Sequence, residues 1–158
     1  MARALIVGCG CLGSELGRVL AQDGWAVRGT SRTEPGAKRI ERKGIEGVVA
    51  DPDRVGTVLE HVGDVAVVAW ALGAASGSSA TDVNGPRLER MLERLVDTPV
   101  RGFVLDAPPA QPAPKELVAA AGATWRIPVR VVEAERSDAG RWVEAMRAAV
   151  NGLIGGGG

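Results

Sequence analysis

The sequence has no tyrosine, and its 158 residues include one histidine and two cysteines. So few histidines and cysteines exclude a zinc site of the ordinary ligand count and a framework of disulfides. Lysine and arginine balance aspartate and glutamate at 19 each, which leaves no overall positive charge to attract nucleic acid or an anionic membrane surface. We therefore expect a protein without a metal site that binds neither nucleic acid nor membranes.

Long apolar runs are also missing from the sequence. No run approaches the roughly 20 residues that cross a membrane, and Met1 leads directly into an apolar strand pattern without a charged leader segment. For these reasons we expect a cytoplasmic protein. At 158 residues the chain has the length of one domain. We expect this domain to span residues 1–154 and to be followed by a flexible glycine tail over residues 155–158.

Short β-branched runs alternate with longer amphipathic stretches along the whole chain. This alternation is typical of an α/β fold in which a doubly wound parallel sheet of about six strands lies between two layers of helices. The pattern predicts strands over residues 4–7, 25–30, 45–50, 64–70, 100–106 and 128–133. It predicts helices over residues 12–23, 35–43, 51–61, 81–96 and 138–153, another helix that carries Leu117 and Val118, a flexible stretch over residues 73–80, and a proline-rich loop over residues 107–114.

The most informative motif is Gly8-Cys9-Gly10-Cys11-Leu12-Gly13, which directly follows a predicted strand and opens a predicted helix. In that position a GxGxxG pattern indicates a dinucleotide-binding turn. Gly8 would permit the tight turn, Gly10 would let the backbone approach a pyrophosphate, and Gly13 would let the helix pack closely on the strand. Backbone amides at the start of the helix would face the phosphates. The candidate pyrophosphate-binding residues are therefore Gly8, Gly10, Cys11, Leu12 and Gly13, and the alternative is a glycine-rich turn without a ligand.

The end of the second predicted strand indicates which dinucleotide would bind. An NAD site places an acidic residue there for the ribose hydroxyls, whereas an NADP site supplies an arginine for the 2′-phosphate. Here Thr30, Ser31 and Arg32 stand at this point, and no carboxylate appears before Glu34. Two hydroxyls and a guanidinium predict a phosphate pocket, to which Lys38 and Arg39 would add positive charge. This pattern favours NADP(H) over NAD(H), and the alternative is that Arg32 is a solvated loop residue.

Several residues keep more than one interpretation. Asp51, directly after the third predicted strand, either contacts the adenine amino group or caps the helix that follows. Cys9 and Cys11 occupy the variable positions of the glycine turn, where we expect small buried residues, although a thiol at a helix N-terminus can also be redox-sensitive. His61 is expected to be a capping or surface residue near a helix end.

Four segments together resemble a known family: "LIVGCGCLGSELGRVLAQDGWAVRGTSR", "GIEGVVAD", "DVAVVAWA" and "VNGPRLERML". Their order and spacing are similar to those of the atypical extended short-chain dehydrogenase/reductases, the NAD-dependent epimerase/dehydratase-like Rossmann proteins, over roughly residues 3–106. The resemblance implies NAD(P) bound across the carboxyl ends of the strands, with Arg32 where NADP-preferring members have a basic residue and Asp51 where many members contact adenine. It also implies a group of residues that border the adenosine and nicotinamide riboses, namely Ala69, Trp70, Ala71 and Leu72.

The chain departs from this family at the catalytic residues. Catalytic members use a Tyr-x-x-x-Lys pair after the fifth strand, and this sequence has no tyrosine. The fifth predicted strand ends in Leu105-Asp106-Ala107, and Lys115 follows without a matching partner. The segment that usually builds a substrate lobe after the sixth strand is also missing, because only one predicted helix follows it.

The hypotheses for function follow from this departure. One is a minimal NADP(H)-dependent oxidoreductase that acts on an unknown small substrate and uses Asp106 or Lys115 with a bound water. Another is a non-catalytic sensor or binding module in which NAD(P) occupancy changes contacts with a partner. A third is a reductase whose second substrate, a deazaflavin or similar compound, accepts a hydride directly. The sequence leaves open whether the protein forms a homodimer.

Overall fold

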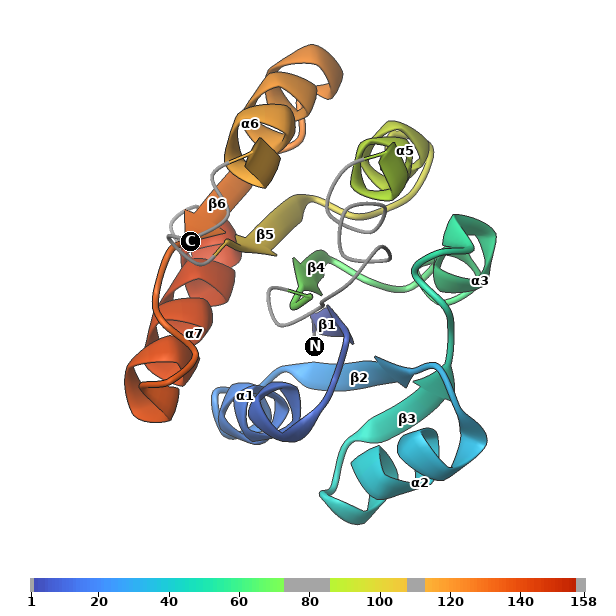
Figure 1. Cartoon of the computed structure of the whole chain (residues 1–158), viewed down its shortest axis with the longest axis vertical. Helices are drawn as coiled ribbons and strands as arrows, with labels where there is room; N and C mark the ends of the chain where they lie inside the picture. The colour runs from blue at the N-terminus through green and yellow to red at the C-terminus, as the bar shows by residue number, and fades with distance from the viewer. Residues whose placement is uncertain (1, 73–85, 108–112, 156–158) are drawn as a thin grey trace.

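The computed structural model describes residues 2–72, 86–107 and 113–155. Its centre is one sheet of six parallel strands in the order β3-β2-β1-β4-β5-β6 (Figure 1), which confirms the predicted doubly wound fold. The strands are β1 (Arg3–Val7), β2 (Ala26–Ser31), β3 (Glu46–Val49), β4 (Val67–Trp70), β5 (Gly102–Asp106) and β6 (Val129–Val132). The helices are α1 (Cys11–Gln22), α2 (Glu34–Arg42), α3 (Val55–Leu59), α5 (Pro86–Leu95), α6 (Ala113–Trp125) and α7 (Ala139–Gly155).

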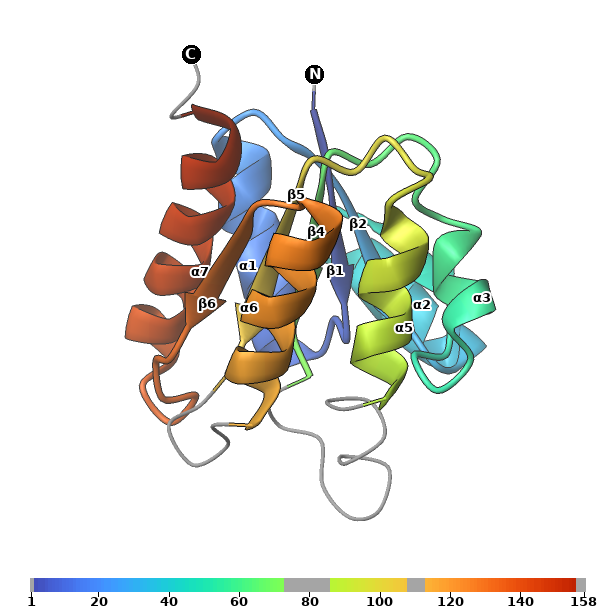
Figure 2. The same cartoon turned by 90° about the horizontal axis from the view of Figure 1, so that it is seen from above.

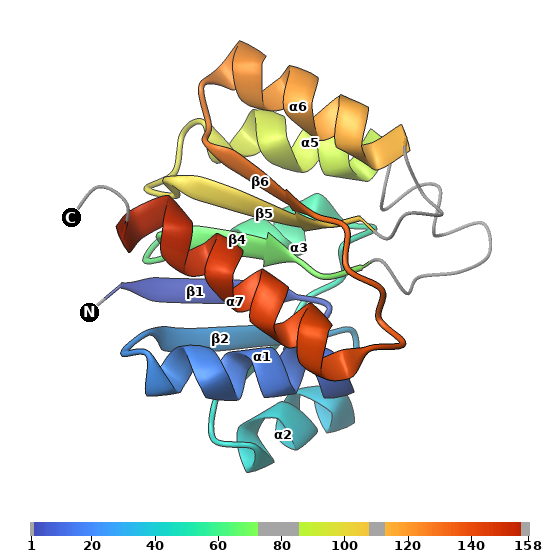
Figure 3. The same cartoon turned by 90° about the vertical axis from the view of Figure 1, so that its left-hand side faces the viewer.

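Two helix layers cover the sheet, and the central strands are apolar on both faces for that reason (Figures 2 and 3). In β1, Leu5 and Val7 face a core shared with α3, α5 and α6. Ala4 and Ile6 face the opposite core, to which α1, α2 and α7 contribute. Alternate side chains of a strand point to opposite faces, so the continuous apolar run predicted for this segment fills both cores. In the described part of the chain, no helix is long and apolar enough to cross a membrane.

Several predicted segments are shorter in the structure, and two of them differ by three residues or more within the described residues. The helix expected over residues 51–61 is reduced to α3, because Asp51 accepts a hydrogen bond from the Asp53 amide at 2.9 Å and forms a turn instead of a helix N-terminus. Asp51 therefore does not cap a helix. The strand expected from residue 64 begins at Val67. The stretch 73–80 and most of the proline-rich loop lie outside the described residues.

Helix α7 is fixed to α1 by a cluster of polar contacts. Asp23 accepts hydrogen bonds from Arg147 Nε at 2.7 Å and from Asn151 Nδ2 at 2.9 Å. The Asn151 side chain in turn accepts one from Trp25 Nε1 at 2.7 Å. The bond from Arg147 lowers the pKa of the Asp23 carboxyl to about 2. These contacts hold the helix that carries Trp142 against the rest of the sheet.

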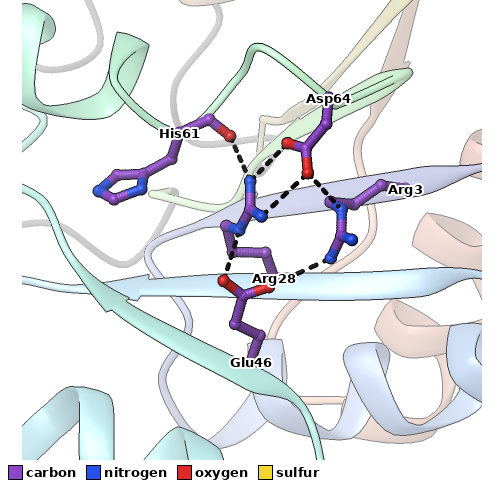
Figure 4. A network of polar contacts seen from close by, with 5 residues as sticks. All are labelled: Arg3, Arg28, Glu46, His61 and Asp64. Atoms are coloured by element: carbon purple, nitrogen blue, oxygen red, sulfur yellow. Dashed lines mark hydrogen bonds and ion pairs between the residues drawn. The ribbon is translucent and has the colours of Figure 1, made fainter.

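A second polar cluster joins β1, β2, β3 and the loop before β4 (Figure 4). Arg28 Nη1 donates to Asp64 Oδ1 and to the carbonyl of His61, both at 2.7 Å, while its Nε lies 3.0 Å from Glu46 Oε2. Arg3 joins the same two carboxylates, at 3.1 Å to Glu46 and 3.0 Å to Asp64. Arg28 lowers the pKa of Asp64 through these hydrogen bonds. His61 follows the end of α3, and it takes part in this cluster through its backbone carbonyl, which accepts the hydrogen bond from Arg28.

Arg28→Ala is expected to lower the free energy of unfolding by about 2 kcal/mol, because it leaves the His61 carbonyl without its donor and removes one of the two arginines that Glu46 and Asp64 share. Only 11% of the Arg28 side chain is exposed, so water replaces the lost bonds poorly. Chemical denaturation measures the change. Arg18→Ala is the matched control, since its pair with Glu15 is about half exposed and contributes little. Equal losses for the two variants would contradict a stabilising role of the buried guanidinium.

Candidate functional site

A cleft of about 680 Å³ lies beside the carboxyl ends of β1, β2 and β4. The strand order reverses between β1 and β4, and open α/β sheets bind ligands outside the strand ends at such a point. The cleft combines residues of the glycine turn, the end of β2, helix α2, the segment after β4 and the loop after β6. Its lining residues are Gly8, Cys9, Gly10, Cys11, Ser14, Thr30, Ser31, Arg32, Gly36, Arg39, Ile40, Lys43, Ala71, Leu72 and Arg136.

The glycine turn lines the cleft, and its first glycine is sterically required. Gly8 has a φ of +85°, and a Cβ added there would lie 2.5 Å from Leu72 Cδ2 and 2.9 Å from the Ala71 carbonyl oxygen. A Cβ on Gly13 would make a tight contact, 3.2 Å from the Gly8 carbonyl oxygen, that a small shift could relieve. The Gly8 amide donates to Thr30 Oγ1 at 3.1 Å. The turn is therefore tightly packed against β2 and β4.

Gly10 differs from the other two glycines because it faces open space. No atom of the described residues lies within 4 Å of the position that its Cβ would take. Gly10 is also the N-cap residue of α1, with a φ of −83°, and it has no side chain that could cap the helix. The first amides of a helix have no partner within it. The amides that follow Gly10 are thus available for an anion from the cleft.

Positive side chains also line the cleft. Arg32 follows β2, Arg39 lies on α2, and Lys43 is the C-cap residue directly after α2. No aspartate or glutamate occurs among the cleft-lining residues of the described chain. Arg32 makes only long ion pairs, at 3.7 Å to Asp51 and 3.6 Å to Asp53, and about half of its side chain is exposed. These side chains can therefore attract an anionic group.

The residues predicted from the sequence are divided by the structure into two groups. Gly8, Gly10, Cys11, Thr30, Ser31, Arg32, Ala71 and Leu72 line the cleft together. Leu12, Gly13, Asp51, Ala69 and Trp70 do not line it. Trp70 is fully buried in the core against Phe103, with ring centroids 6.1 Å apart.

Lys43, which was not predicted as a site residue, takes the place expected for Lys38. It follows directly after the end of α2, and its side chain lines the cleft together with that of Arg39.

The two cysteines have different surroundings. Cys9 is buried, and burial raises the pKa of its thiol to about 11. Its Sγ lies 2.5 Å from the position that a Cβ on Gly29 would take, so it fills the space between the turn and β2. Cys9 is thus the small buried residue that we expected, whereas Cys11 is exposed at the cleft. Within the described ranges, no cluster of three or more histidine, cysteine or acidic residues could hold a metal ion.

Arg136 is the cleft residue that no sequence signal indicated, because it stands in a loop without a motif. Its Nε donates to Asp106 Oδ2 at 2.8 Å, and its Nη2 donates to the Ala71 carbonyl oxygen at 2.7 Å. Trp142 lies against the guanidinium at 4.7 Å from ring centroid to Cζ and donates its Nε1 hydrogen to Asp106 Oδ1 at 3.0 Å. These contacts hold Arg136 at the edge of the cleft.

The two candidate catalytic residues have different positions. The Asp106 side chain has no exposed surface and makes an ion pair with Arg136. It therefore positions Arg136 and does not face the cleft itself. Lys115 belongs to the first turn of α6, and its side chain lies outside the described residues.

Comparisons with known proteins identify the fold. No protein-family model and no curated protein matches the sequence. A putative short-chain dehydrogenase/reductase from Corynebacterium glutamicum matches with a TM-score of 0.69 and 20% identity over 94% of this chain and 91% of that one. UDP-glucuronic acid 4-epimerase from Bacillus cereus, solved with NAD, matches with a TM-score of 0.65 and 14% identity over 83% and 56%. Yeast methylglyoxal/isovaleraldehyde reductase, solved with NADPH, matches with a TM-score of 0.65 and 13% identity over 84% and 54%.

These likenesses concern the arrangement of strands and helices. At such low identities the chain shares the Rossmann fold of reductases and sugar epimerases. It spans little more than half the length of the epimerase and of the yeast reductase.

Proposed function

We propose that the cleft binds NADP(H), and that the protein is an NADP(H)-binding Rossmann protein of the short-chain reductase/epimerase type. The observation that carries the proposal is a single cleft lined by a glycine turn at a helix N-terminus and by basic side chains, with no acidic residue in the lining formed by the described chain. Structures with the same fold were solved with NAD or NADPH. The fold therefore supports a nicotinamide dinucleotide, and the choice between the two depends on the residues of this chain.

The phosphates of the dinucleotide fit two parts of the cleft. The pyrophosphate would lie at Gly10 and the α1 amides, because Gly10 leaves open space there. The 2′-phosphate of NADP would lie at Arg32 and Ser31, which stand where an NAD site has an acidic residue. Arg39 and Lys43 would add positive charge on the same side. Asp51, 3.7 Å from Arg32, would lie near the adenine.

The same residues bear on whether the protein is an enzyme. Without a tyrosine, it cannot use the Tyr-x-x-x-Lys pair of catalytic reductases. Asp106, which could replace the tyrosine as a proton donor or acceptor, is held by Arg136 and Trp142. This geometry favours a cofactor-binding module over a reductase that follows the usual mechanism. Consumption of NADPH in the presence of a panel of carbonyl and quinone compounds separates the two, since a binding module consumes none.

Titration of the purified protein with NADPH, NADP and NADH tests the proposal directly. Calorimetry is the primary measurement, and tryptophan fluorescence is the second. We expect NADPH and NADP to bind with micromolar dissociation constants and NADH to bind at least tenfold more weakly, because NADH has no 2′-phosphate. The proposal is rejected if no dinucleotide binds below millimolar concentration.

Arg32→Ala is expected to raise the dissociation constant of NADPH about 10- to 30-fold and that of NADH less than twofold. A charge-assisted hydrogen bond to phosphate contributes about 1.5–3 kcal/mol, and the lower part of this range applies to a side chain that is about half exposed. Only NADPH has the phosphate concerned. Arg42→Ala is the matched control, since it removes the same charge from the neighbouring helix α2 without touching the cleft lining. An equal loss of affinity for both dinucleotides in Arg32→Ala would contradict the assignment of Arg32 to the 2′-phosphate.

A further inference from the structure

The positive charges of the cleft form two separate regions. Arg32, Arg39 and Lys43 lie on the side of β2 and α2. Arg136 follows β6, and it contacts Asp106 at the end of β5 and Ala71 just after β4. In the sheet order β3-β2-β1-β4-β5-β6 these strands make up the other half. The phosphate sites proposed above use the turn after β1 and the β2 side, whereas Arg136 follows β6. It borders the glycine turn through its acceptor, the Ala71 carbonyl oxygen, which lies 2.9 Å from the Cβ position of Gly8.

The guanidinium of Arg136 is held in one orientation before any ligand binds. Asp106 accepts from its Nε, the Ala71 carbonyl accepts from its Nη2, and the Trp142 ring covers one face. Asp106 is itself fixed by the bond from Trp142 Nε1. Ordering an arginine side chain on binding normally costs entropy. Here the protein has already ordered it, which lowers the cost of binding an anion.

One edge of this guanidinium remains for a ligand. No hydrogen-bond acceptor for Nη1 occurs among the residues that the structure describes. Arg136 lines the cleft, and 21% of its side chain is exposed. A fully buried donor would need an acceptor within the protein or an ordered water. The Nη1 edge instead has access to the cleft, where a carboxylate or phosphate oxygen could accept from it.

We propose that Arg136 binds the oxyanion group, a carboxylate or a phosphate, of a second, acidic small molecule that occupies the β4–β6 side of the cleft beside the dinucleotide. This inference rests on the proposed function, because the dinucleotide defines which part of the cleft is left for the second molecule. Asp106 and Trp142 are positioning residues in this site, since they act through Arg136. The substrate or signal of the protein is accordingly an anion and not a neutral carbonyl compound.

Calorimetric titration of the NADPH-saturated protein with malonate tests the proposal, with malonamide as the uncharged analogue of the same shape. We expect malonate to bind with a millimolar dissociation constant and malonamide not to bind. Arg136→Gln is expected to raise the dissociation constant of malonate at least tenfold and that of NADPH less than threefold. Inorganic phosphate, titrated in the same way, shows whether the site prefers carboxylate or phosphate, and the proposal covers either result.

Two further variants separate a binding role from a structural one. Arg136→Lys keeps the charge but loses the planar edge, so it should bind malonate more weakly than the natural protein and more tightly than Arg136→Gln. Arg141→Gln is the control, because it removes an exposed charge next to Trp142 without altering the cleft lining. Thermal unfolding establishes that each variant is folded. A purely structural Arg136 would change the melting temperature and leave the ratio of malonate to malonamide affinity unchanged.

Several outcomes overturn the inference. The inference is wrong if malonate binds to Arg136→Gln as tightly as to the natural protein. It is also wrong if neither malonate nor phosphate binds to the natural protein up to roughly 100 mM. If Arg136→Gln weakens NADPH and ADP-ribose tenfold or more, Arg136 serves the pyrophosphate of the cofactor and not a second ligand. Failure of the proposed function is distinguishable, because the natural protein would then bind no dinucleotide at all.

Discussion

Asp106→Ala is expected to lower the free energy of unfolding by about 3 kcal/mol, a larger loss of stability than the one expected for Arg28→Ala. The Asp106 side chain has no exposed surface, and it accepts hydrogen bonds from both Arg136 and Trp142. Alanine would leave a partly buried guanidinium without its counter-charge and an indole N–H without an acceptor. It would also leave a cavity where the carboxylate was.

Urea denaturation followed by tryptophan fluorescence measures this loss. Asp97→Ala is the control, because Asp97 is an exposed acidic residue and its loss should change stability little. A double variant, Asp106→Ala with Arg136→Met, should recover part of the loss, since it removes the unpaired charge as well. A loss below about 1 kcal/mol in Asp106→Ala would show that the ion pair is not a stabilising feature of the fold.

Gly10→Val is expected to raise the dissociation constant of NADPH about 100-fold, which corresponds to roughly 2.7 kcal/mol, while the free energy of unfolding falls by only about 1 kcal/mol, the cost of valine at an N-cap position. The two effects separate because of where Gly10 lies. Its φ of −83° suits any residue, and no described atom lies within 4 Å of its Cβ position. The valine side chain therefore fits the free protein but occupies the space proposed for the pyrophosphate.

Gly63→Val is the matched control for this experiment. The Cβ position of Gly63 also has no described atom within 4 Å, and Gly63 does not line the cleft. The Gly63→Val variant should therefore bind NADPH with the same affinity as the natural protein. Calorimetry gives the affinities, and thermal unfolding shows whether each variant is folded. Retention of full NADPH affinity by Gly10→Val would argue against a pyrophosphate at the glycine turn.

Most of the sheet could be predicted because its signals are local. The alternation of β-branched runs with amphipathic stretches reflects which faces are buried, and each strand carries that pattern within its own few residues. The glycine turn is equally local, since the requirement of Gly8 for a φ of +85° depends on the backbone at one residue. The predicted helix after Asp51 was too long, because a side-chain hydrogen bond to the Asp53 amide favours a turn there.

The sequence by itself therefore determined the parallel sheet, the glycine turn and the basic residue after the second strand. Only the tertiary structure decided that Cys9 is buried while Cys11 is exposed, and that Trp70 packs in the core away from the cleft. It also decided that Arg136 meets Asp106, 30 residues earlier, and Ala71, 65 residues earlier. Such contacts depend on how β4, β5 and the loop after β6 are placed side by side, and no spacing within one segment of sequence encodes that placement. The second positive region of the cleft is a product of this packing.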